Sequence, residues 1–342
     1  MHKKYKLYFF IILLPIVFLG LVVPIGFYVY DPLQIFHKHW FVPENTLNSN
    51  MRLQAAGLIN NYDFDSVIIG NSILENTSAR EASEVLGGKY INLSLSGSGP
   101  YERSIVLNYL LKKRKIKTII LQIDLNFNNS GHEVDIDRPN AWKDNPGVKS
   151  RFGGIDKWIT YHNHRQLSNL MHNTLSNISS LDIKSTQINS FENETSKLEF
   201  VDNYLISFVR SYKDVRFIFI VPPYSRLYYA IEARQNGLGL YFSWLRYLTK
   251  LAEKYSNLEI YAFGDRDFVD DIANYRDIYH YSEEINSFML HAIASKDGLL
   301  TKDNIDQYIE TVDQLTREYD IQAINNYVKS ELIKQTGNMS KN

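Results

Sequence analysis

The sequence predicts an α/β domain with a parallel sheet, preceded by one N-terminal transmembrane helix. From Asp63 onward, short β-branched runs alternate with helical segments, which is the pattern of parallel strands joined by helical crossovers. An uncharged stretch from Leu7 to Tyr30 follows a basic N-terminus. The 342 residues are 44% hydrophobic and 22% charged, a composition typical of a folded globular protein.

The uncharged stretch is predicted to be a membrane anchor. At about 1.5 Å per residue it spans roughly 36 Å, enough to cross a hydrocarbon core of about 30 Å. Lys3, Lys4 and Lys6 precede it, which predicts a cytoplasmic N-terminus and an exported remainder. A cleaved signal peptide is the alternative, but its apolar region would be shorter and would end at a small-residue site. We therefore predict a single-pass anchor over residues 1–30.

Five short apolar runs are predicted to form the sheet, since each has the β-branched and aromatic content of a buried strand. The runs are Ser66–Ile69, Tyr90–Leu93, Thr118–Ile123, Arg216–Val221 and Leu258–Tyr261. Helices are predicted between and after them, at about 78–88, 100–114, 240–255 and 282–293. The first of these helices opens on a capping box, Ser78 to Glu81.

The remaining segments complete the predicted organisation. Residues 31–60 are interpreted as a juxtamembrane linker and residues 61–300 as the α/β domain. Within that domain, residues from about 130 to 200 are polar and rich in Asn and Ser, which indicates an insertion of short helices. Residues 301–342 carry helical periodicity and then a tail, so we predict a C-terminal amphipathic helix.

Composition excludes several functions. The sequence has no cysteine, which removes disulfide frameworks, thiolate metal sites and cysteine nucleophiles. The formal net charge of -1 gives no field for a general nucleic-acid partner. His162 with His164, and His132 with Glu133, form only pairs, whereas a metal site needs three or four ligands. We therefore predict no metal, no other cofactor and no nucleic-acid binding.

The candidate site residues follow the predicted strands, because ligands collect at the carboxyl ends of parallel strands. Ser72 comes after the first strand, and Asp277 lies three residues before His280 near the end of the domain. A serine becomes a nucleophile when a histidine takes its proton, and that histidine needs an acceptor on its other nitrogen. The structural alternatives are an ordinary strand-exit turn at Ser72 and a chance spacing of Asp277 and His280.

Three motifs in the sequence resemble the SGNH (GDSL-like) hydrolase superfamily. They are Val67–Ser72, Ile91–Gly97 and Asp277–Ser282, and the resemblance covers roughly residues 60–295. Within that superfamily, the sequence resembles the membrane-anchored branch that modifies cell-envelope polymers. This branch includes the alginate O-acetylation proteins and the teichoic-acid D-alanyl transfer protein. The resemblance implies a flavodoxin-like, three-layer fold and a location in a bacterial inner or cytoplasmic membrane, with the C-terminal domain outside the cytoplasm.

The same resemblance implies roles for individual residues. Ser72 is the expected nucleophile, Asp277 and His280 complete the triad, and Gly97 or Gly99 donates to the oxyanion. Two departures from the family pattern stand out. Asn71 replaces the usual aspartate before the serine, and the Gly-x-Asn-Asp block after the third strand is replaced by Asp124, Leu125 and Asn126. Asn126 is the candidate oxyanion amide.

Arg226, after Pro222 and Pro223, is a further candidate substrate-binding residue, available to a phosphate or carboxylate; a surface arginine after a rigid strand exit is the alternative. The predicted activity is ester chemistry on cell-envelope or capsular polysaccharide, as an esterase or an O-acyltransferase, with a membrane partner that supplies the acyl group in the transferase case. The alternative is an inactive SGNH-like module that binds polysaccharide or scaffolds an export complex.

Overall fold

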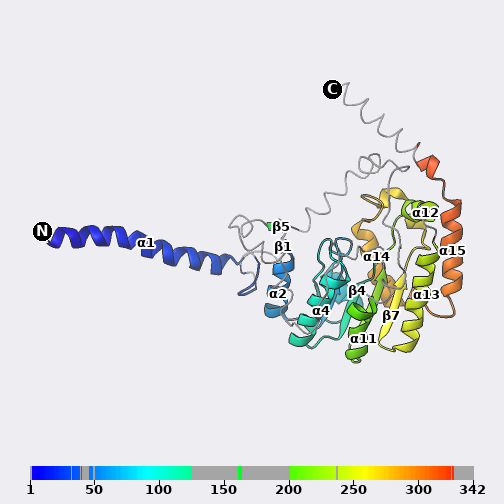
Figure 1. The fold of residues 1–342 in the computed structure, drawn as a ribbon, viewed down its shortest axis with the longest axis horizontal. Coiled ribbons are helices and arrows are strands. Elements are labelled where there is room, and N and C mark those ends of the chain that lie inside the picture. Colours follow the sequence, from blue (N-terminus) through cyan, green and yellow to red (C-terminus); the bar gives the residue numbers. More distant parts are fainter. Residues whose placement is uncertain are drawn as a thin grey trace, which may run out of the picture. The chain divides into compact units, whose positions relative to one another are not determined.

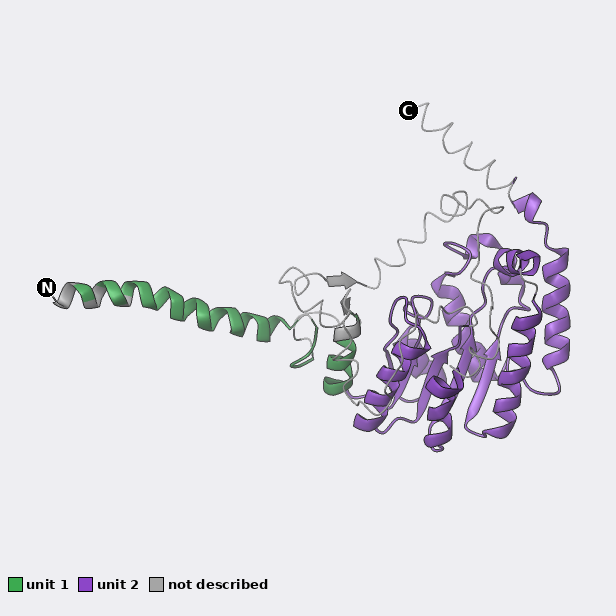
Figure 2. Cartoon of the chain, viewed as in Figure 1, with its two compact units in different colours: residues 1–62, 146–163 green, residues 63–145, 164–342 purple. Residues whose placement is uncertain are grey.

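The protein is described by a computed structural model that covers residues 2–31, 33–38, 40, 46–48, 51–124, 161–163, 201–235, 238–324 and 326. The chain divides into two compact units, which Figure 2 colours separately. Unit 1 comprises residues 1–62 and 146–163, and unit 2 comprises residues 63–145 and 164–342. The two units are considered one at a time below.

Unit 1 begins with the long apolar helix α1 (His2–Tyr30), which contains Pro15 and Pro24. Its segment Ile11–Tyr30 has a mean hydropathy of 2.6 and no residue buried within the protein. Such a helix is long and apolar enough for a membrane-spanning anchor or for a signal sequence. After α1, the carboxylate of Asp31 accepts hydrogen bonds from the backbone N–H groups of Ile35, Phe36 and His37, so the chain turns sharply at the helix end.

The segment predicted to be a linker, residues 31–60, contains regular structure. The strand β1 (Thr46–Asn48) pairs antiparallel with β5 (Tyr161–Asn163), and the helix α2 (Met51–Asn61) follows. No helix was predicted in this segment. Apart from β5, the predicted polar insertion at about 130–200 lies outside the described residues.

Unit 2 is built on a five-stranded parallel sheet in the order β3-β2-β4-β6-β7. Numbered along the chain, this is the order 2-1-3-4-5 of flavodoxin-like folds. The strands are β2 (Ser66–Ile69), β3 (Tyr90–Asn92), β4 (Thr118–Gln122), β6 (Arg216–Val221) and β7 (Leu258–Ala262). The central residues of β2, β4, β6 and β7 are fully buried. The predicted α/β fold with a parallel sheet, and the one N-terminal apolar helix, are confirmed.

Helices cover both faces of this sheet, which makes three layers (Figure 1). On one face α3 (Ala79–Leu86) packs against α14 (Glu283–Ser295). The other face carries α4 (Pro100–Lys113), the π-helix η2 (Asp202–Ile206) with α11 (Ser207–Ser211), and α13 (Gly239–Lys254). The side-chain oxygen of Ser78 accepts the N–H of Glu81 at 3.2 Å, so the predicted cap of α3 is present.

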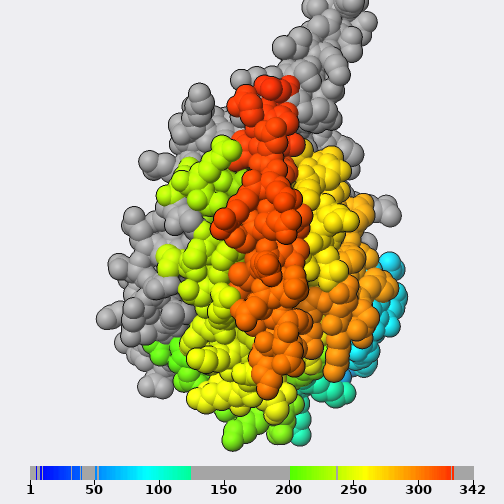
Figure 3. Space-filling view, turned by 90° about the vertical axis from the view of Figure 1, so that its right-hand side faces the viewer, coloured from blue at the N-terminus to red at the C-terminus, as the bar shows by residue number. Residues whose placement is uncertain are grey.

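The C-terminal helix α15 (Ile305–Glu318) packs against α12 (Arg226–Gln235) and α13. Figure 3 shows α15 running along the surface between the segment of α12 and α13 and the chain that follows β7. Tyr308 of α15 is buried, and its hydroxyl oxygen accepts the backbone N–H of Gly264 at 2.9 Å. The predicted amphipathic helix therefore begins at Ile305 and packs on α12 and α13, beside the chain that follows β7.

Candidate active site

The turn that carries Ser72 leaves the carboxyl end of β2 and is held by Asn71. The Oδ1 atom of Asn71 accepts the backbone N–H of Ile73 at 2.9 Å, and its carbonyl oxygen accepts the N–H of Leu74 at 3.2 Å. An Asn side chain that bonds the backbone two residues ahead mimics one arm of a turn. Ser72 is half-buried, so its hydroxyl remains within reach of a small molecule.

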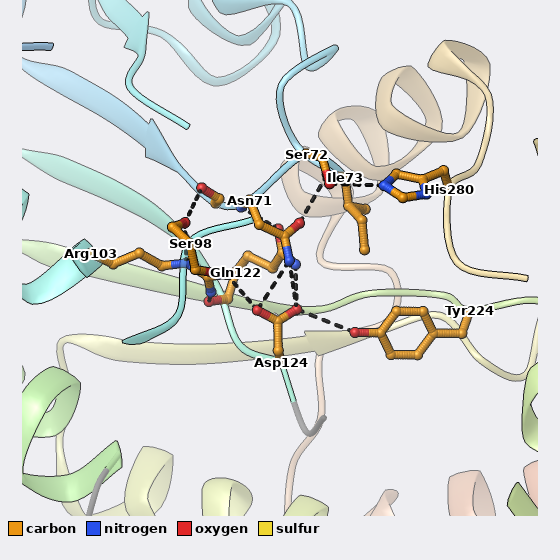
Figure 4. A network of polar contacts seen from close by, with 10 residues as sticks. Asn71, Ser72, Ile73, Ser98, Arg103, Gln122, Asp124, Tyr224 and His280 are labelled. Carbon is orange, nitrogen blue, oxygen red and sulfur yellow. Dashed lines mark hydrogen bonds and ion pairs between the residues drawn. The ribbon is translucent and has the colours of Figure 1, made fainter. Parts of the chain in front are cut away.

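The structure brings Ser72, His280 and Asp277 together in a chain of hydrogen bonds. Ser72 Oγ lies 2.8 Å from His280 Nε2 (Figure 4). On the other side of the ring, His280 Nδ1 lies 2.8 Å from Oδ2 and 3.0 Å from Oδ1 of Asp277. With the Nδ1 proton donated to the carboxylate, Nε2 is left as the acceptor that faces the serine. This is the geometry that general-base activation of a serine requires.

The loop with Asp277 and His280 is tied to the chain that follows β6. The backbone N–H of Ser225 donates to the carbonyl oxygen of Ile278 at 3.2 Å, and the Ser225 hydroxyl donates to the same oxygen at 3.0 Å. Tyr275 donates its hydroxyl proton to the carbonyl oxygen of Pro223 at 2.8 Å. The histidine is therefore held by a neighbouring strand exit as well as by its own loop.

The carboxyl group of Asp277 is stabilised in its charged form. Burial by itself raises the pKa of Asp277, but the hydrogen bond and charge of His280 lower it, as do the backbone N–H groups of His280 and Tyr279. The balance leaves the pKa below its ordinary value. A carboxylate that stays ionised can stabilise the imidazolium that forms when His280 takes a proton.

This shift predicts a loss of stability in acid. Because the folded pKa of Asp277 is depressed, its contribution is full above the unfolded value of about 3.9 and is lost as the pH falls through the folded pKa. Between about pH 5 and about pH 2, the wild type is therefore expected to lose more stability than Asp277→Asn, which cannot titrate. Thermal midpoints of both chains across this range test it, and parallel curves would contradict it.

The two candidate oxyanion glycines lie in the loop after β3, next to the serine turn. The backbone N–H of Leu95 donates to the carbonyl oxygen of Gly70 at 2.8 Å, which fixes the loop beside the turn. Gly97 is exposed and has a φ of 66°, and nothing lies within 4 Å of where its Cβ would be. Gly99 instead caps the start of α4. Nothing lies within 4 Å of the Cβ position of Gly99 either, but Gly97 is the more exposed of the two glycines.

Asn92, the last residue of β3, has a structural role. Its side-chain Nδ2 donates to the carbonyl oxygens of Leu74, Glu75 and Thr77, and its Oδ1 accepts the N–H of Ser94. With all these bonds made inside the fold, the Asn92 amide braces the chain that follows Ser72. The predicted oxyanion amide, Asn126, lies outside the described residues.

A buried polar network lies beneath the serine turn (Figure 4). Arg103 of α4 is fully buried, and its Nη2 lies 2.5 Å from Oδ2 of Asp124. The same guanidinium donates to the carbonyl oxygens of Gln122 and Ser98, each at 2.7 Å. Arg103 and Gln122 were not predicted as site residues, because neither stands in a motif. The one sign in the sequence was the polar Gln122 inside an otherwise apolar strand.

Arg226 is not exposed. Its side chain is fully buried at the start of α12, and its Nε donates to Oδ1 of Asp270 at 2.6 Å. No contact among the described residues joins Arg226 to Ser72 or His280, so its predicted role toward substrate stays a prediction. Within the described residues, no group of three His, Asp or Glu side chains is placed to hold a metal ion.

Close packing at Gly70 makes a further prediction. A Cβ at this position would lie 2.6 Å from Gln122 Oε1 and 2.8 Å from Leu74 Cβ, so Gly70→Ala is expected to destabilise the chain by about 1–3 kcal/mol. Gly239→Ala is the control, since nothing lies within 4 Å of its Cβ. Thermal midpoints compare the two, and equal midpoints would contradict the packing argument.

The fold and the site together define an α/β protein with a serine, a histidine and an aspartate hydrogen-bonded in series at the carboxyl edge of a parallel sheet. No protein-family model matches the sequence, and no curated protein matches it. Among solved structures, a protein provisionally described as a platelet activating factor from Streptococcus pneumoniae is similar, with 14% identity and a TM-score of 0.42 over 73% of this chain and 91% of that one.

Two further solved structures are similar. One, from Bacteroides fragilis and provisionally described as an acylhydrolase, has 12% identity and a TM-score of 0.35, over 71% of this chain and 86% of that one. The other is the C-terminal catalytic domain of peptidoglycan O-acetyltransferase A from Streptococcus pneumoniae, with 12% identity and a TM-score of 0.32, over 69% of this chain and 97% of that one. These similarities are distant and concern the fold alone.

Proposed function

We propose that this chain is a serine-dependent acyl-ester enzyme, either an esterase or an O-acyltransferase. The observation that carries the proposal is the approach of His280 Nε2 to Ser72 Oγ at 2.8 Å, with Asp277 on the other ring nitrogen. Ser72 Oγ attacks the acyl carbonyl while Nε2 takes its proton, and the imidazolium then gives that proton to the departing alcohol.

The developing oxyanion needs donors that are not already engaged. Among the described residues, the backbone N–H groups of Ser72 and Gly97 make no hydrogen bond, so we assign both to the oxyanion. The acyl group then passes to water or to a sugar hydroxyl, which is deprotonated by the same histidine. The second step repeats the first with the attacking and leaving groups exchanged.

The proposed substrate is an acyl ester of cell-envelope or capsular polysaccharide. The helix α1 supports this assignment, since residues 7–30 would hold the chain in a bacterial inner or cytoplasmic membrane with unit 2 outside the cytoplasm. In the transferase case, a membrane partner would supply the acyl donor. The alternative function is a catalytically inactive module that binds polysaccharide. The following experiment would favour this alternative if no serine reacts.

The experiment is covalent labelling of the full chain with a fluorophosphonate, read by intact mass. The expected result is one adduct on the wild type and none on Ser72→Ala. Ser295→Ala is the matched control, because Ser295 is exposed at the end of α14, and it should label like the wild type. A folded wild-type chain without an adduct, or an adduct that survives Ser72→Ala, would contradict the proposal.

A further inference from the structure

The carboxylate of Asp124 lies beneath the serine turn and is surrounded by donors. Its Oδ2 accepts from Arg103 Nη2, and its Oδ1 accepts from Gln122 Nε2 and, at 3.2 Å, from the hydroxyl of Tyr224. Burial, followed by the charge of Asp124, raises the pKa of Tyr224 well above its ordinary value, so this hydroxyl keeps the proton that it donates. Each of these neighbours therefore offers Asp124 a hydrogen.

Asn71, in the turn that carries Ser72, is a further neighbour of the Asp124 carboxylate. Its Nδ2 lies 3.4 Å from both carboxylate oxygens of Asp124, and its backbone N–H donates to Gln122 Oε1 at 3.0 Å. Its Oδ1 is already committed to the N–H of Ile73. The side chain at position 71 must therefore present a hydrogen-bond acceptor to the N–H of Ile73, which holds the turn. Toward Asp124 it must present a group that is not a second acceptor.

An amide meets both requirements, because it has one acceptor and one donor group. A carboxylate can accept from Ile73 but presents a second acceptor to Asp124. With aspartate at position 71, a second carboxylate oxygen would face Asp124 at the same separation, in a network that is almost wholly buried. Like charges at this range in a poorly solvated site repel strongly, or one of them is forced to take up a proton. Either outcome shifts the residue that directly precedes Ser72.

We propose that Asp124 is the positioning residue for the turn that carries Ser72, and that its charge is what requires asparagine rather than aspartate at position 71. The proposal rests on the proposed function for its kinetic readout. Asp124 does not touch the substrate; it acts through Asn71 on one side. On the other side it acts through Tyr224, whose neighbour Ser225 holds the loop of His280.

Exchanging the two side chains tests this assignment. Asn71→Asp in the full chain is expected to slow fluorophosphonate labelling of Ser72 by about 100-fold, because displacements near 1 Å at a reacting atom cost about that much. The double variant Asn71→Asp with Asp124→Asn keeps one carboxylate and one amide, and like Asp124→Asn alone it loses the ion pair of Arg103 with Asp124. In the Asp124→Asn background, Asn71→Asp is therefore expected to slow labelling at least about tenfold less than it does in the wild type, since the repulsion is removed.

Asn203→Asp is the matched control, since it adds the same charge at an exposed position of η2, and it should label at the wild-type rate. Thermal midpoints of all five chains, Asp124→Asn included, accompany the labelling. If Asn71→Asp labels like the wild type, or if it slows labelling equally in the wild-type and Asp124→Asn backgrounds, the assignment is wrong. If Asn71→Asp does not fold, a folded double variant supports the assignment, and a double variant that does not fold either overturns it.

A wild-type chain that does not label would instead defeat the proposed function. In that case the thermal midpoints still decide the pairing, since Asn71→Asp should lower the midpoint of the wild type more than it lowers that of Asp124→Asn. The two failures are thereby distinguished.

Discussion

Replacing Asp277 by asparagine is expected to lower ester turnover by about 10⁴-fold while the fold is retained. Oδ1 of Asp277 accepts the backbone N–H groups of Tyr279 and His280, each at 2.8 Å. In the variant, the amide oxygen keeps these two donors, so the NH₂ group takes the place of Oδ2 and faces His280 Nδ1. Two donors cannot share that contact, and the ring must move its proton to Nε2. The nitrogen beside Ser72 then holds a hydrogen and cannot accept another.

The measurement is kcat/KM on a soluble acyl ester together with the thermal midpoint of each chain near neutral pH. Asp271→Asn is the matched control, because the Asp271 carboxylate also accepts a backbone N–H, that of Ala273, but is exposed and has no histidine partner. Its rate should equal that of the wild type. A modest loss in Asp277→Asn, no greater than in the control, would show that this carboxylate does not set the tautomer of His280.

Replacing Arg103 by methionine is expected to lower the free energy of unfolding by about 3–5 kcal/mol, which is the usual result of removing one partner of a buried ion pair. Both side chains are almost fully buried, with 0% of Arg103 and 5% of Asp124 exposed. Methionine fills much of the volume but supplies no charge, so the Asp124 carboxylate loses its cation. The carbonyl oxygens of Ser98 and Gln122 lose their donors as well.

Denaturant midpoints of the full chain in a mild detergent measure this effect. Arg246→Met is the control, since Arg246 lies 2.6 Å from Asp306 but the two side chains are 50% and 78% exposed. Exposed pairs contribute about 0–1 kcal/mol, so the control should change little. Equal shifts in the two variants would mean that burial does not distinguish the two ion pairs.

The sheet was predictable from the sequence because its signals are local. Each strand is a short run of β-branched or aromatic residues that ends at small or polar residues, and the cap at Ser78 lies beside the helix that it starts. The pairing of Asp277 with His280 is local as well, since a three-residue spacing on a tight loop is enough to bring a carboxylate to a ring nitrogen.

The residues that support the site gave no such signal, because their partners lie far along the chain. Arg103 forms an ion pair with Asp124, which is 21 residues away in the sequence, and Tyr224 donates a hydrogen bond to Asp124 from 100 residues away. The departure from the family pattern at Asn71 is visible in the sequence, but the carboxylate that its side chain contacts, that of Asp124, lies 53 residues later. The burial of Arg226 was not predicted for the same reason, since Asp270, with which it forms an ion pair, is 44 residues away.

The 208 residues that separate Ser72 from His280 also separate them in time. At roughly 5–20 residues per second, a ribosome adds the histidine about 10–40 s after the serine. Throughout that interval, and in any chain that stops short of residue 280, Ser72 is an ordinary alcohol with no base beside it. Under the proposed function, the pair of Ser72 and His280 is thus completed only after most of the chain has been synthesised, so an unfinished product lacks the base that would activate the serine.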